Sequence, residues 1–249
     1  MKSLRTLALA TGLAVLGMAA FAGFADAQTV SLDLGGEGTL TGRVVQLVMM
    51  ITVLSLAPSI LIMVTSFTRM VVVLSLMRSA IGAQQTPPNS VLISLALFLS
   101  AFVMAPTFQK AYTDGIAPLM QEQIDAPTAF QKTSAPFETF MLKNVRPKDL
   151  ELFVHLAKAP EPKTPEATPL HVLVPAFMIS ELRRSFEIGF LIFIPFLVID
   201  MVVASVLMSM GMMMLPPVMI SLPFKLIFFV LVDGWGLIAG SLVQSFGAG

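Results

Sequence analysis

Long uncharged stretches alternate with charged ones along the chain, and they predict four membrane-crossing helices. No residue between Arg43 and Arg69 is charged. Residues 44–64 rise by about 1.5 Å each in a helix, enough to cross a hydrocarbon core of about 30 Å. A polar break at residues 86–89 stops a further apolar run, so a new helix should begin after it. The four expected helices include residues 44–64, 91–106, 186–209 and 219–243.

The segment between the second and third of these helices has a different character. Residues 112–185 hold most of the charges and both histidines, His155 and His171, which is typical of a water-facing domain. We therefore expect an all-α membrane protein of four long hydrophobic helices in two helical hairpins, with a helical periplasmic domain inserted between the second and third. The expected segments are 44–111 for the first hairpin with its cytoplasmic connection, 112–185 for the periplasmic domain and 186–249 for the second hairpin.

The N-terminus has the pattern of a cleaved signal peptide over residues 1–27. Two basic residues precede an uncharged stretch, and Ala25 and Ala27 then give the small-x-small pattern that signal peptidase reads. Residues 28–43 would follow as a short periplasmic segment. An uncleaved first transmembrane helix is the alternative, because the uncharged stretch exceeds the usual 7–15 residues.

The distribution of basic residues agrees with a periplasmic start. The first span then delivers Arg69 and Arg78 to the cytoplasm, in a connection without acidic residues, as the positive-inside rule requires. The long 112–185 segment falls in the periplasm, where the rule does not apply to long loops. Counting the spans from a periplasmic N-terminus also places the turn at residues 210–218 in the cytoplasm.

Composition supports membrane association and excludes several other classes. Hydrophobic residues make up 56% of the chain and charged residues only 12%, against about 25% charged in soluble domains. The formal net charge is zero, without the basic patch of a nucleic-acid binder. The chain has no cysteine, and no G-x-S-x-G or H-E-x-x-H string occurs. We therefore expect neither an enzyme nor a bound cofactor or metal.

Methionines are concentrated in the expected turn of the second hairpin. Met210, Met212, Met213 and Met214 lie within it, among seven methionines between positions 201 and 219. Methionine is unbranched and polarizable, and it adapts to irregular surfaces. The residues alone favour a role in filling the core of the hairpin, and the alternative is a soft ring around a channel.

Asp200, Lys225 and Asp233 are the only charges after residue 187. An unpaired charge at membrane depth is costly, so each needs a partner or water. Asp200 and Lys225 lie about 15 and about 12 Å along their helices from the turn, hence at similar depth. Pairing within one subunit or between subunits is the favoured interpretation, and a proton relay is the alternative.

Arg69 and Arg78 flank an apolar stretch on one helix and project from opposite sides of it. A helix with charge at both ends cannot lie simply in lipid. Anchoring to lipid headgroups and packing against other subunits are both open.

Five strings in the chain resemble the FliP family of flagellar type III protein-export gates. They are TRMVVVLSLMR (68–78), GAQQTPPN (82–89), MGMMMLPP (210–217), LPFK (222–225) and VDGW (232–235). Their order and spacing match over roughly residues 44–245. The signal peptide favours the flagellar branch over the injectisome relatives of this family.

The resemblance implies a multi-pass subunit of the bacterial inner membrane at the flagellar basal body. Several copies would assemble with FliQ and FliR into a closed cone, near FlhB and FlhA, and pass unfolded flagellar proteins. The turn methionines would form its gasket, and the Asp200–Lys225 pair would support assembly. Subunits of this family sit raised toward the periplasm, so helices that resemble spans would pack largely on protein. Packing between subunits is expected of Arg69, Arg78, Pro87, Pro88 and Asn89. The alternative class is a small-molecule or proton transporter.

Overall fold

The computed structural model describes residues 40–247 apart from 84, 159–163, 165–166 and 213–215. The chain divides into two units, Met1–Val53 and Leu54–Gly249. The expected signal peptide, its cleavage residues Ala25 and Ala27, and most of the 28–43 segment lie outside the described residues.

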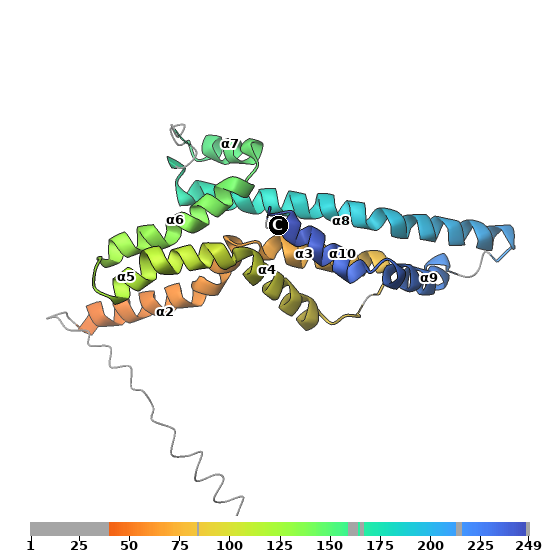
Figure 1. The fold of residues 1–249 in the computed structure, drawn as a ribbon, viewed down its shortest axis with the longest axis horizontal. Coiled ribbons are helices and arrows are strands. Elements are labelled where there is room, and N and C mark those ends of the chain that lie inside the picture. The colour runs from red at the N-terminus through yellow and green to blue at the C-terminus, as the bar shows by residue number, and fades with distance from the viewer. Residues whose placement is uncertain (1–39, 84, 159–163, 165–166, 213–215, 248–249) are drawn as a thin grey trace, which may run out of the picture. The chain divides into compact units, whose positions relative to one another are not determined.

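Every regular element in the described part of the chain is helical (Figure 1). This confirms the all-α class. The helices are α2 (Leu40–Met63), α3 (Phe67–Ile81), α4 (Asn89–Ala111), a π-helical turn (Tyr112–Ile116), α5 (Ala117–Met120), α6 (Ala126–Asn144), α7 (Pro147–Leu156), α8 (Leu170–Ser209), α9 (Pro217–Leu231) and α10 (Gly234–Gln244).

Helix α3 is the centre of the larger hydrophobic core. Met70, Val73, Leu74 and Met77 follow the i, i+3, i+4, i+7 spacing that places side chains on one helical face, and all four are buried. This face packs against α4, α8 and α9. A helix that sequence reasoning treated as a cytoplasmic connection is therefore the structural centre of the unit.

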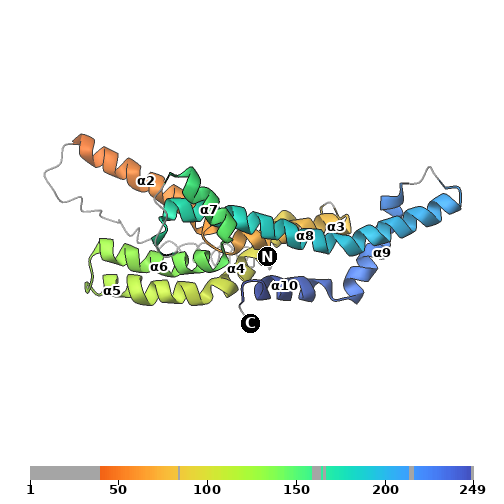
Figure 2. The ribbon, with the colours of Figure 1, turned by 90° about the horizontal axis from the view of Figure 1, so that it is seen from above.

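A second, smaller core joins α6 and α7 to the first turns of α8. Met141 of α6 and Leu173, Ala176 and Phe177 of α8 are buried there, and Phe153 of α7 packs against them. Helix α6 runs back beside α4 and α5, as both views show (Figures 1 and 2). The 112–185 segment is thus built onto the membrane helices through shared cores.

Two helical segments are long and apolar enough to cross a membrane, and bent pairs raise the number to four. The two are Asn89–Met120, with 32 residues, and Leu170–Ser209, with 40 residues. The pairs are α2 with α3 and α9 with α10, each interrupted by a short break. Of the expected boundaries, the one at residues 111/112 and the one at 185/186 both lie inside continuous helical segments.

The expected single helix over residues 219–243 is wrong, because it is broken between α9 and α10. The two helices are bent by 63°, and Asp233 between them has φ of 50°, in the left-handed region. A Cβ on Gly234 would lie 2.2 Å from the Phe229 ring, so the ring packs where only glycine leaves room. The Asp-Gly pair is a turn signal that hydropathy alone conceals.

Candidate functional site

Arg69 of α3 is held by an ion pair in the middle of the fold. Its Nε donates to Oε2 of Glu181 at 2.8 Å, and its Nη2 donates to Oε1 of the same carboxylate at 2.5 Å. Nη1 donates to the carbonyl oxygen of Ser245 at 3.1 Å, and the guanidinium lies 3.6 Å from the centre of the Phe246 ring. Both charged residues are completely buried. The pair therefore ties α3, α8 and the turn after α10 together.

The Arg69 side chain lies inside its own chain. It pairs with Glu181 of the same chain, and its expected packing against other subunits stays a prediction. Helical spacing alone would pair Glu181 with Arg184, three positions along the same helix. The partner instead lies 112 positions upstream, at a distance in sequence that helical spacing cannot detect.

Arg78 shapes the connection between α3 and α4. Its Nη1 donates to the carbonyl oxygen of Pro87 at 3.1 Å and to Oδ1 of Asn89 at 2.6 Å. Pro88, with an extended backbone, then precedes the first turn of α4. The structure thus brings together Arg78, Pro87 and Asn89 within one chain. Their expected contact with other subunits stays a prediction.

Asp200 of α8 and Lys225 of α9 meet within one chain. Lys225 Nζ lies 2.6 Å from Oδ2 of Asp200, and the hydroxyl of Ser221 donates to Oδ1 at 2.5 Å. The Lys225 side chain is 5% exposed and the Asp200 side chain 27% exposed. Asp233 does not join this cluster, because it occupies the break between α9 and α10. The role of the pair in assembly stays a prediction.

The described methionines around the turn are exposed. Met210 is 61% exposed and Met212 is 44% exposed at the end of α8. Met201, Met208 and Met219 on the flanking helices are exposed as well. Met213 and Met214 lie outside the described residues. For the five described methionines, filling the core of the hairpin is therefore wrong in the single chain.

A buried polar cluster near the start of α8 was missed by sequence reasoning. The Ser180 hydroxyl donates to Oδ2 of Asp149 at 2.7 Å and accepts from the backbone N–H of Arg146 at 3.1 Å. Ser180 and Asp149 are both buried. The hydroxyl fixes the entry of α7 against α8. The only sequence signal was the position of Asp149 in the first turn of a short helix, where a carboxylate suits the helix dipole.

These arrangements bind helices together. In the part of the chain that the structure describes, the buried charges of Arg69, Glu181 and Lys225 each face an opposite charge, which suits burial. Among the residues that the structure describes, no three or more His, Cys, Asp or Glu side chains form a cluster suited to a metal.

Long apolar helices, joined by buried ion pairs and carrying uncovered apolar side chains, define a multi-span helical membrane protein. Comparison with known proteins gives the family. The profile described as "FliP family" matches residues 50–242. The chain belongs to the FliP family, and as a member it is a component of the flagellar export apparatus.

Three relatives named "Flagellar biosynthetic protein FliP" show how far the likeness extends. The protein of Caulobacter vibrioides is 64% identical over 249 residues, which is 100% of this chain and 94% of the relative. That of Bacillus subtilis is 58% identical over 81% of this chain and 91% of its own length. The protein of Agrobacterium fabrum is 53% identical over 91% of this chain and 95% of its own length.

Proposed function

We propose that the chain is a subunit of the flagellar type III protein-export gate in the bacterial inner membrane, at the basal body. Several copies assemble with FliQ and FliR around one passage for unfolded flagellar proteins, next to FlhB and FlhA. The role is mechanical and not catalytic, and it needs no cofactor. Family membership and the long apolar helices support this proposal.

The proposed topology follows the positive-inside rule. A signal peptide over residues 1–27 leads to a periplasmic start, and the first hairpin carries its connection, with Arg78, on the cytoplasmic side. The helical segment after α4 lies in the periplasm. The second hairpin returns through α8, so that the turn at residues 210–218 faces the cytoplasm. The continuity of α8 from Leu170 to Ser209 supports a first half that extends into the proposed periplasmic domain.

The single observation that carries the gasket role is the exposure of the turn methionines. A chain that used these side chains for its own packing would bury them, yet every described one is exposed. Flexible, polarizable side chains can close around an empty passage and still yield to an unfolded chain of any sequence. Turns from several copies would therefore make a soft seal.

Ion leakage tests the gasket directly. We expect that changing Met210, Met212, Met213 and Met214 to alanine makes membranes that carry the gate conduct small ions, because alanine shortens each side chain and opens the ring. The measurement is the conductance of reconstituted gate complexes in a planar bilayer.

The matched control is Met120→Ala, since Met120 is also an exposed methionine but lies at the end of α5. Its conductance should equal that of the unaltered complex. If the fourfold alanine variant assembles and stays sealed, the gasket role is refuted.

A further inference from the structure

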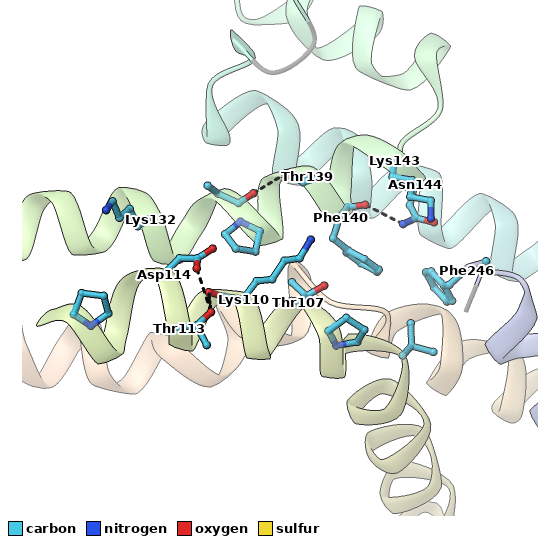
Figure 3. A pocket seen from close by; sticks show the side chains of 16 residues that line it. Thr107, Lys110, Thr113, Asp114, Lys132, Thr139, Phe140, Lys143, Asn144 and Phe246 are labelled. Atoms are coloured by element: carbon cyan, nitrogen blue, oxygen red, sulfur yellow. Dashed lines mark hydrogen bonds between the residues drawn. The ribbon is translucent and has the colours of Figure 1, made fainter. Parts of the chain in front are cut away.

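A groove of about 910 Å³, called the lysine groove below, opens between α4 and α6 and is bounded at one end by the turn after α10 (Figure 3). Lys110 extends from α4 into the space between the two helices, and Lys132 and Lys143 line the groove from α6. Asp114 of the π-helical turn also lines it. None of the three lysines forms an ion pair with another described residue. The lysine groove therefore has an excess of two positive charges.

The turn between α5 and α6, residues 121–125, carries the opposite charge and is called the acidic turn below. Glu122 and Asp125 are the only charged residues between positions 115 and 131. Both are exposed, and neither pairs with a basic side chain in the part of the chain that the structure describes. The acidic turn does not line the groove of its own copy, whose α6 residues begin at Lys132. Its two negative charges equal the excess positive charge of the lysine groove.

The backbone holds Glu122 in an uncommon conformation at the end of this helical hairpin. Its φ is 56°, in the left-handed region that few residues other than glycine and asparagine adopt. Its N–H donates to the carbonyl oxygen of Leu119 at 3.0 Å, and the N–H of Gln123 donates to that of Pro118 at 2.9 Å. Backbone strain of this kind is concentrated at binding sites. The acidic turn is thus ordered before any partner binds, which lowers the entropic cost of docking.

We propose that the acidic turn of one copy docks in the lysine groove of the next copy. The lysine ammonium groups donate charge-assisted hydrogen bonds to the two carboxylates. Because groove and turn are different surfaces of one chain, each copy receives one neighbour and docks into another, and such contacts build rings or helices. The inference rests on the proposed function, in which several copies surround one passage. Lys132, Lys143 and both carboxylates belong to the segment 112–185, so the contact needs no lipid.

Disulfide trapping in membranes tests this contact, since the chain has no cysteine of its own. The variant Asp125→Cys/Lys132→Cys carries one thiol in the acidic turn and one in the groove. Within one copy the two Cα atoms lie about 10.5 Å apart along α6, beyond the limit of about 7 Å for a disulfide. Oxidation with copper phenanthroline should therefore link different copies into a ladder of two, three and more. The control Asp125→Cys/Lys148→Cys places the second thiol at an exposed lysine outside the groove and should give no ladder.

Charge reversal gives a second measurement, the self-association of the purified full chain in detergent by analytical ultracentrifugation. Glu122→Lys/Asp125→Lys should weaken association about tenfold, because two lysines would then face the cations of the groove. Adding Lys110→Glu/Lys132→Glu to the same chain should restore association. The matched control is Glu151→Lys, which reverses an exposed carboxylate on α7 and should leave association unchanged.

The ladder and the recovery together decide the proposal. A ladder from the groove variant, with association restored in the fourfold reversal, supports it. Assembled copies without a disulfide between positions 125 and 132 overturn it and leave the export-gate function intact. Linked pairs without larger species would show a two-fold contact, and a fourfold variant that does not recover would show that these charges do not pair; either result overturns the proposal. Chains that stay single in membranes and in detergent would contradict the proposed function itself, and this contact with it.

Discussion

The two halves of α8 differ both in charge, with four charged side chains in residues 170–189 and one in residues 190–209, and in what covers them. Of the ten buried residues of this helix, eight lie in the proximal half, residues 170–189, and two in the distal half, residues 190–209. The proximal half holds Glu181 under Arg69 and packs on α3, α6 and α7. The distal half exposes large side chains such as Phe190 and Met201 and ends at the methionine turn.

The difference shows that hydropathy does not reveal which side chains cover the individual apolar residues of a helix. The proximal half is covered by its own chain, and polar side chains such as Glu181 are tolerated there because each has a partner. Apart from its contact with α9, the distal half is uncovered in the single chain, so we expect lipid or other subunits to cover it. We infer that the proximal half maintains the fold of one subunit and that the distal half serves the assembly.

The largest expected effect comes from breaking the ion pair of the proximal half. Glu181→Ala should lower the free energy of unfolding by about 3–5 kcal/mol, because it leaves the buried Arg69 guanidinium without a counter-charge. Denaturant titration of the purified chain in mixed micelles measures this. Glu187→Ala is the control, since its carboxylate pairs with Arg183 at 3.0 Å in an exposed position and should cost about 0.5 kcal/mol. Equal losses would contradict the distinction between buried and exposed pairs.

The pair of the distal half should be weaker. Lys225→Ala should cost about 1.5–3 kcal/mol, because Asp200 keeps the Ser221 hydrogen bond and is partly exposed. The same titration gives the value. A charge-swapped Asp200→Lys/Lys225→Asp chain that assembles and secretes normally would support a structural pair. A swapped chain that assembles but cannot secrete would indicate a proton relay.

A smaller effect should distinguish close packing from open surface at two glycines. A Cβ on Gly189, at the end of the proximal half, would lie 2.3 Å from Cδ1 of Leu76, whereas a Cβ on Gly240 in α10 meets nothing within 4 Å. Gly189→Val should therefore cost about 1–3 kcal/mol more than Gly240→Val, since the change in helix propensity cancels between them. Thermal unfolding in micelles compares the two. Equal stabilities of the two variants would show that α3 shifts without measurable cost to accommodate a side chain at position 189.

Much of the fold follows from local sequence. Charge gaps and proline breaks place the apolar helices, and the polar break at residues 86–89 does separate α3 from α4. These features depend on neighbours in the sequence, which helix propensity and hydropathy report directly. The Asp200–Lys225 contact could be predicted for a related reason, because a short turn places equal lengths of two helices side by side.

What the sequence could not supply are contacts between distant segments. Arg69 and Ser245 lie 176 positions apart, and no periodicity links them. The central position of α3 depends on which helices surround it, and a helix apolar over most of its surface does not indicate its neighbours. The break at Asp233 was overlooked because the apolar residues on both sides mask an Asp-Gly turn.

Cysteine cross-linking tests most directly whether the methionine turns of several copies converge on one passage. The chain contains no cysteine, so a single Met210→Cys change gives one reactive thiol per copy. Treatment of membranes with a short bis-maleimide should yield cross-linked species of two copies. The control Met120→Cys, at a similarly exposed methionine, should give no cross-linked species. Only monomers from Met210→Cys, in membranes where the copies are otherwise assembled, would contradict convergence of the turns.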